Sequence, residues 1–202
     1  MRIVNIMKAA IISIIVAFLF VALILGVSSM VLKDKYKTAT YLIEGITEFK
    51  ESGEEVKPVL ENGVIISYPV YGSKYGSVKI ETAGIDIPLY YGADYALLKY
   101  GAVHDEQSYF PGEGGSVIIS AHNFNGFFAN LPDAKIGDII EIETSYGNFK
   151  YKIYDTQIIG EDRTDLVPIQ KDEEVLMAYT CWPIHNIGHA SQRYVVYAKI
   201  DK

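Results

Sequence analysis

Hydrophobic residues follow three different patterns along the chain, and each pattern predicts a different kind of structure. The stretch from Ala9 to Leu32 is apolar and carries no charged residue. The following stretch, 33–62, is mostly polar, with apolar residues at helical spacing. From Val64 onward, apolar and polar residues alternate in short runs, which is typical of half-buried β-strands.

The N-terminal apolar run is long enough to cross a membrane. Its 24 residues would form a helix of about 36 Å, whereas the hydrocarbon core of a bilayer is about 30 Å thick. The apolar region of a cleaved signal peptide is shorter, about 7–15 residues. We therefore predict an uncleaved transmembrane signal anchor over 9–32, preceded by a cytoplasmic tail over 1–8.

The orientation of this anchor does not follow from its flanking charges. Basic residues lie on both sides of it, with Arg2 and Lys8 before the run and Lys33, Lys35 and Lys37 after it. The positive-inside rule therefore gives no decision. A short leader, one span and one following domain favour an external C-terminal domain.

The polar stretch 33–62 is predicted to be a stalk with one amphipathic helix. Leu42, Ile46 and Phe49 lie on one face of that helix, and the breakers Gly53 and Pro58 follow it. A stalk of this kind would space the domain from the bilayer or dock against it.

The remainder of the chain, 63–202, is predicted to be all-β. Tyr146-Gly147-Asn148 is a hairpin turn signal, and only Asp94–Leu98 and Gly126–Leu131 look like short helical turns. We expect a single closed β-barrel of about eight strands. The strand-like runs are Val64–Tyr68, Ser77–Ile80, Ile85–Tyr91, Ser116–Ala121, Asp138–Glu143, Asn148–Ile159, Glu174–Thr180 and Arg193–Ile200.

The charge of the chain argues against nucleic-acid binding. It has 25 acidic and 18 basic residues, a formal net charge of −7, and no dense Lys/Arg cluster. Such a chain gains little from a polyanionic phosphate backbone.

Cys181 is the only cysteine, so an internal disulfide is excluded. A lone cysteine is either a reactive thiol or a small buried hydrophobic residue. Cys181 follows a predicted strand, and the chain breaks at Pro183, so the residue should project into the loop layer where sites are usually built. This placement favours a reactive thiol.

A reactive thiol needs a base or a cation nearby. His122 directly follows the predicted strand Ser116–Ala121, and Arg193 begins the last one, bringing rigid donors and a permanent charge. His104 lies in a polar, acidic loop and is expected to be a solvated surface group. Three strand ends thus present a thiol, an imidazole and a guanidinium, which together supply a nucleophile, an acid/base and a stabiliser.

Three motifs around these residues resemble the signatures of the sortase family of transpeptidases. They are Ala178-Tyr179-Thr180-Cys181-Trp182-Pro183 around the nucleophile, Ser120-Ala121-His122-Asn123, and Gln192-Arg193-Tyr194-Val195-Val196. The resemblance covers about 64–202, keeps the order His, Cys, Arg, and fits the N-terminal anchor. The stretch from Cys181 to Arg193 is most similar to class D sortases.

The resemblance implies a sortase-like barrel and a two-step acyl transfer, for which we expect no cofactor. Cys181 would attack the Thr carbonyl of an LPxTG-like sorting signal, His122 would protonate the leaving amine, and Arg193 would hold the substrate or stabilise the oxyanion. Thr180 would add a hydroxyl beside the site. The expected partners are surface proteins bearing the sorting signal and an amine acceptor of peptidoglycan. The expected location is the membrane of a Gram-positive-type cell, with the catalytic domain outside.

Other interpretations of the same residues stay open. Cys181, His185 and His189 have a spacing that would suit a zinc ion on a helix, but Pro183 and Gly188 make a helix there improbable. Loop acids show no calcium-binding pattern. Neither the Ser-His-Gly-Cys run of L,D-transpeptidases nor the Cys-before-His order of papain-like enzymes is present. A membrane-tethered β-domain that only binds a partner is the non-enzymatic alternative, and the 16 tyrosines are compatible with it.

Overall fold

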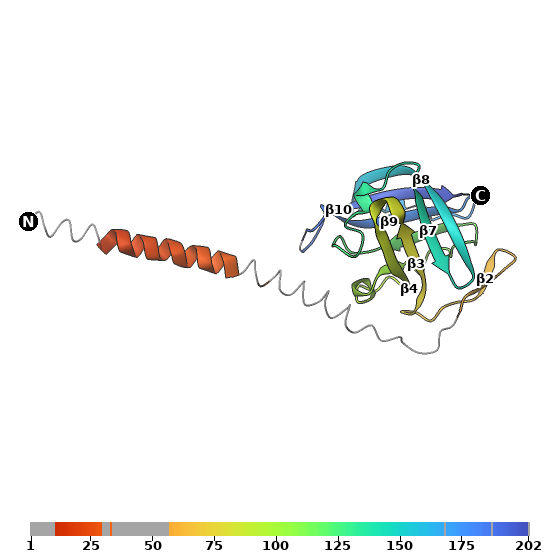
Figure 1. The fold of residues 1–202 in the computed structure, drawn as a ribbon, viewed down its shortest axis with the longest axis horizontal. Coiled ribbons are helices and arrows are strands. Elements are labelled where there is room, and N and C mark those ends of the chain that lie inside the picture. The colour runs from red at the N-terminus through yellow and green to blue at the C-terminus, as the bar shows by residue number, and fades with distance from the viewer. Residues whose placement is uncertain (1–10, 30–32, 34–56, 168, 187, 202) are drawn as a thin grey trace, which may run out of the picture. The chain divides into compact units, whose positions relative to one another are not determined.

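The computed structural model describes residues 11–29, 33, 57–167, 169–186 and 188–201 (Figure 1). The chain divides into two units, Met1–Ile43 and Glu44–Lys202. In the first unit, Ile11–Ser29 forms a helix, and among the described residues it alone is long and apolar enough to cross a membrane. This helix lies within the predicted span 9–32, whereas its cleavage and orientation stay predictions. The amphipathic helix predicted after Lys33 lies outside the described residues.

The described part of the second unit consists of β-strands joined by turns and short 3-10 helices. The strands are β1 (Val59–Glu61), β2 (Val64–Ser67), β3 (Lys74–Ile80), β4 (Ile85–Tyr91), β5 (Ala102–His104), β6 (Ser116–Ser120), β7 (Ile139–Thr144), β8 (Gly147–Gly160), β9 (Val175–Trp182) and β10 (Gln192–Ile200). The 3-10 helices are η1 (Glu81–Ala83), η2 (Leu97–Lys99), η3 (Leu131–Asp133) and η4 (Thr164–Leu166).

The strands β3 to β10 close into one barrel with the order β10-β8-β7-β3-β4-β5-β6-β9 (Figure 1). The pairs β4–β5 and β6–β9 are parallel, and the other neighbouring pairs are antiparallel. The predicted closed barrel of about eight strands is therefore confirmed. The strands β1 and β2 form a separate hairpin, and β1 lies within the stretch that the sequence assigned to the stalk.

Local boundaries differ from the sequence expectations in a few turns. The hairpin between β7 and β8 turns at Ser145 and Tyr146, because Thr144 pairs with Gly147. The expected helical turn at Gly126–Leu131 is wrong, since the chain there forms turns and the 3-10 helix η3 begins only at Leu131. Gly126 has a positive φ of 84°, which a right-handed helix does not accommodate.

The side chains of β9 alternate between two buried faces of the barrel wall. Leu176 and Ala178 are fully buried on the inner face. Met177 lies on the outer face, in a second hydrophobic cluster with Ile118, Ile159, Val195 and Tyr197. Leu166 and Val167 of the β8–β9 connection cover this cluster. Because both faces are packed, a shift of one residue would bring each side chain of β9 into a space shaped for another.

His104 departs most from the sequence expectation, because it is a core residue and not a solvated one. It ends β5 with 0% of its side chain exposed. Its Nε2 lies 3.0 Å from the carbonyl oxygen of Tyr109, and its Nδ1 lies 2.9 Å from the hydroxyl of Tyr75. A carbonyl only accepts, so Nε2–H donates to it and the Tyr75 hydroxyl donates to Nδ1. The acidic residues that follow His104 are typical of a loop, and β5, with only three residues, is too short to show alternation.

Burial of His104 makes the stability of the domain sensitive to mild acid. Desolvation lowers the pKa of His104 from 6.5 to about 4. Between these pH values the unfolded chain binds a proton that the folded chain does not, so stability falls as the pH falls. We expect this residue to remove about 3 kcal/mol from the free energy of unfolding as the pH falls from 6.5 to 4. Urea unfolding of the full chain in detergent, followed by fluorescence of Trp182, measures the change.

The matched variant is His104→Gln, whose neutral amide can keep both hydrogen bonds. Its stability should vary less with pH than that of the wild type over this range. Identical pH dependence in the two proteins would contradict the assignment.

Candidate active site

The register between β9 and β10 places Cys181 opposite Arg193. The two residues are direct partners in this antiparallel pair. Side chains of directly opposed residues project from the same face of a sheet and lie next to each other. The thiol and the guanidinium therefore share one face of the barrel wall.

His122 is carried to the same place by the parallel pairing of β6 with β9. Ser120 pairs with Tyr179, and the two chains stay together beyond the end of β6. On one side of His122, the Thr180 hydroxyl donates to the carbonyl of Ala121 at 2.8 Å. On the other side, Asn123 bonds to the segment that follows β9, donating from its side-chain amide to the Pro183 carbonyl at 2.9 Å. His122 thus lies beside Cys181.

Strand periodicity identifies the shared face. Ile118, Met177 and Val195 belong to one cluster on the outer face of the barrel. His122, Cys181 and Arg193 lie two or four positions along the chain from these three residues, and the side-chain period of a strand is two. Cys181 and Arg193 therefore project from the outer face, at the end of the cluster, and His122 lies two residues beyond the end of β6, next to the same end of β9.

Thr180 does not join them. Its side chain is 1% exposed and lies on the inner face, between those of its neighbours Tyr179 and Cys181 on the outer one. Its hydroxyl is already bonded to the Ala121 carbonyl. A buried and bonded hydroxyl is not available to a substrate, so the position of Thr180 supports a part in aligning β6 with β9.

His122 is surrounded by aromatic rings that sequence reasoning did not identify. The ring centroids of Tyr95 and Phe127 lie 5.7 Å from that of His122, both nearly perpendicular to it, and Phe124 lies at 6.3 Å. Burial among these groups lowers the pKa of His122. A lowered pKa favours the neutral imidazole at neutral pH and makes the imidazolium a stronger acid.

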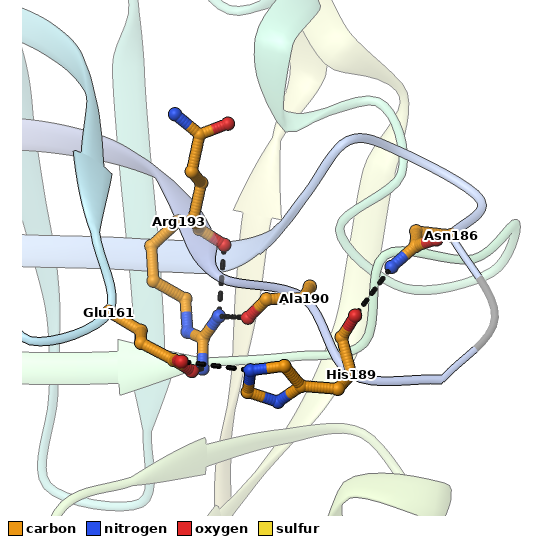
Figure 2. A network of polar contacts seen from close by, with 6 residues as sticks. Glu161, Asn186, His189, Ala190 and Arg193 are labelled. Atoms are coloured by element: carbon orange, nitrogen blue, oxygen red, sulfur yellow. Dashed lines mark hydrogen bonds and ion pairs between the residues drawn. The ribbon is translucent and has the colours of Figure 1, made fainter.

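Arg193 is held by groups from two connections (Figure 2). Its Nη1 donates to the carbonyls of Ala190 at 2.6 Å and Gln192 at 2.9 Å. Its Nη2 donates to Oε2 of Glu161 at 3.2 Å, and Oε1 of the same carboxylate lies 2.9 Å from Nε2 of His189. No sequence signal marks Glu161, because it lies far from Arg193 along the chain.

The free thiol of Cys181 is half-buried. With His122 and Arg193 next to it, the arrangement can supply a nucleophile, a proton carrier and a fixed cation to one peptide bond. Among the described residues, no group of three or more His, Cys, Asp or Glu side chains is arranged to hold a metal ion. The zinc interpretation of Cys181, His185 and His189 therefore has no geometric support.

Known proteins share both the sequence and the fold of this domain. The family model of the sortase domain matches residues 78–201. The chain is 32% identical over 131 residues to Sortase D of Bacillus subtilis (strain 168), a match that covers 65% of this chain and 66% of that protein. The match thus spans slightly less than two thirds of that relative. It agrees with the resemblance to class D noted in the sequence.

Solved structures agree with this similarity. A Sortase D5 transpeptidase of Clostridium perfringens aligns with a TM-score of 0.58 and 27% identity, covering 65% of this chain and 81% of that one. Sortase C1 of Streptococcus agalactiae, solved in complex with MTSET, aligns with a TM-score of 0.59 and 27% identity, covering 64% and 69%. Sortase A of Listeria monocytogenes, at 20% identity and a TM-score of 0.57, covering 64% and 88%, shares the fold.

The aromatic surroundings of His122 predict how a change at Tyr95 alters its titration. Tyr95→Ala removes one ring and admits water, so desolvation weakens and the pKa of His122 should rise toward 6.5. Tyr95→Phe keeps the ring and should leave the pKa close to that of the wild type. Titration of the four histidine Cε1–H signals by NMR measures both variants. An unchanged or lower pKa in Tyr95→Ala would show that burial by this ring is not the cause.

Proposed function

Because this chain belongs to the sortase family, we propose that it is a cysteine transpeptidase in which Cys181, His122 and Arg193 are the catalytic groups. The observation that supports the proposal is the register of β9 with its two neighbours, which pairs Cys181 with Arg193 and runs β6 beside β9 to within two residues of His122. The substrate is an LPxTG-like sorting signal at the C-terminus of a surface protein. The acceptor is an amine of peptidoglycan or its precursor.

In the first half of the reaction, the Cys181 sulfur attacks the Thr carbonyl carbon of the sorting signal. A C–S bond forms, and the negative charge that develops on the carbonyl oxygen is stabilised by the Arg193 guanidinium. The C–N bond then breaks, and His122 gives a proton to the departing amine. The acyl group is left on Cys181 as a thioester.

In the second half, an amine attacks the thioester carbon. A new C–N bond forms, the C–S bond breaks, and the proton lost by the amine passes through His122. The surface protein leaves joined to the acceptor by an amide bond. Dividing one amide exchange into two acyl transfers is ordinary covalent catalysis.

The surroundings of His122 suit it to take up the thiol proton and then to give that proton to the leaving amine. Burial lowers its pKa, so the resting imidazole is neutral at neutral pH and can take the thiol proton as the sulfur attacks. The imidazolium then formed is destabilised by the same burial, and it gives up its proton readily to the leaving amine. No group outside the chain is needed for this transfer.

The proposed location is the outer face of a cell membrane of the Gram-positive type. The apolar helix Ile11–Ser29 supports a single membrane anchor in the same chain as the barrel. Anchoring would hold the site close to proteins and cell-wall precursors that are themselves membrane-bound.

The proposed activity is tested with the full chain in detergent, a panel of LPxTG-like peptides and an added amine. Mass spectrometry should find a ligated product and, without amine, an acyl adduct on Cys181. Cys181→Ala should lose both, with turnover at background. A parallel reaction with a chelator tests any need for metal. Ligation that survives Cys181→Ala would refute the role of the thiol, and no product or adduct with any peptide would refute the proposed reaction.

A second prediction concerns the shape of the cation at position 193. Arg193→Lys keeps the charge but loses the planar fork that bonds both Glu161 and two carbonyls. We expect kcat to fall roughly 10²-fold, the cost of losing one oxyanion donor. The rate at which a small neutral reagent alkylates Cys181 should change much less. Wild-type kcat in Arg193→Lys would show that charge alone is sufficient and that the fork has no catalytic part.

A further inference from the structure

The guanidinium of Arg193 is partly occupied by the protein itself. A guanidinium has five N–H donors, and three bonds go to the carbonyls of Ala190 and Gln192 and to the carboxylate of Glu161. The side chain is 25% exposed, and two of its five donors remain for a substrate. The orientation of these remaining donors depends on the groups that hold the other three.

Glu161, directly after β8, contacts the β9–β10 connection at two points and β10 at one. Its carboxylate contacts Arg193 through Oε2 and His189 through Oε1. Its backbone N–H donates to the carbonyl of Ser191 at 2.9 Å. Figure 2 shows this carboxylate beside the guanidinium and joined by a dashed line to the imidazole of His189, with Asn186 bonding the connection to itself through the His189 carbonyl.

We propose that Glu161 is a positioning residue that holds the Arg193 guanidinium toward the substrate carbonyl that Cys181 attacks. This inference rests on the proposed function, because it assigns Glu161 a part in that reaction. Arg193 projects from the same face as Cys181, and Glu161 is the group with formal negative charge that fixes its far end. His189 contacts the same carboxylate and has a secondary part in holding it.

The arrangement is suited to orienting a side chain more than to stabilising the fold. The side chains of His189 and Glu161 are 75% and 34% exposed, and ion pairs at such sites contribute little to stability. Orientation has a larger effect on a reaction, since a displacement of about 1 Å can cost roughly 10²-fold in rate. Loss of Glu161 should therefore reduce turnover while leaving the domain folded.

The kinetic test uses Glu161→Gln in the full chain in detergent, with the peptide and amine that the wild type accepts. Gln keeps the size and a hydrogen-bond acceptor but loses the charge. We expect kcat to fall by about 10-fold to 10²-fold with KM changed much less. Glu161→Asp should recover part of the loss. Asp162→Asn removes the same charge from the next residue, which is not one of the groups that hold the Arg193 guanidinium, and should behave like the wild type.

An independent measurement follows the guanidinium itself. The chain has three arginines, Arg2, Arg163 and Arg193, so their ¹⁵Nε–H NMR signals are few enough to assign. In Glu161→Gln, the Arg193 signal should show faster proton exchange and greater motion. Arg163 is held by Asp165 through two bonds of 2.7 Å and is an internal reference that should not change.

The outcomes separate this inference from the proposed function. A slower kcat together with a more mobile Arg193 supports it. Wild-type kcat in Glu161→Gln, a faster kcat, or an unchanged Arg193 signal overturns the role of Glu161 while the wild-type adduct on Cys181 stands. If the wild-type chain forms no adduct with any peptide, the proposed function fails, and this role of Glu161 fails with it.

Discussion

The site depends on the register of β9 between β6 and β10. Leu176 and Ala178 fill the inside of the barrel, whereas Met177 packs in the outer cluster. A slip of one residue would exchange these faces, sending the Cys181 thiol into the core and the Thr180 hydroxyl outward. Both faces are packed, so a slip would force each side chain into a space shaped for another, which typically costs about 1–3 kcal/mol. The packing of β9 therefore enforces the position of its sulfur. The residues that stabilise the fold thus also determine where the chemistry can take place.

The two partners of Cys181 are adjusted by different physical means. His122 lies among aromatic rings, which lower its pKa by excluding water and keep the imidazole neutral until a proton arrives. Arg193 has a permanent charge, and what its surroundings control is direction, through a carboxylate and two carbonyls. The pKa of His122 is therefore set by desolvation, and the direction of the Arg193 guanidinium is set by hydrogen bonding.

Much of this architecture could be read from the sequence, and the misses have identifiable causes. Alternation predicted a closed barrel of about eight strands, but it counted Val64–Tyr68 among them, and it missed β5, whose three residues are too few to show a period. For the same reason His104 was taken for a surface group, although it is a bonded core residue. The order of the three motifs and the position of each at a strand end identified His122, Cys181 and Arg193 as candidates. No local pattern could reveal Glu161, because its contact with Arg193 exists only once β8 and β10 pair. The inward direction of Thr180 likewise follows from register and not from its neighbours in the motif.

The central claim is that the groups at positions 122, 181 and 193 act together on one carbonyl at the outer face of β9. The most direct measurement is a crystal structure of the protein with a peptide-mimetic adduct on the Cys181 sulfur. The account predicts that the oxygen of the adduct lies about 3 Å from a nitrogen of Arg193 and that the imidazole of His122 borders the same carbon. An adduct that extends away from both groups, with its oxygen in solvent or bonded elsewhere, would contradict it.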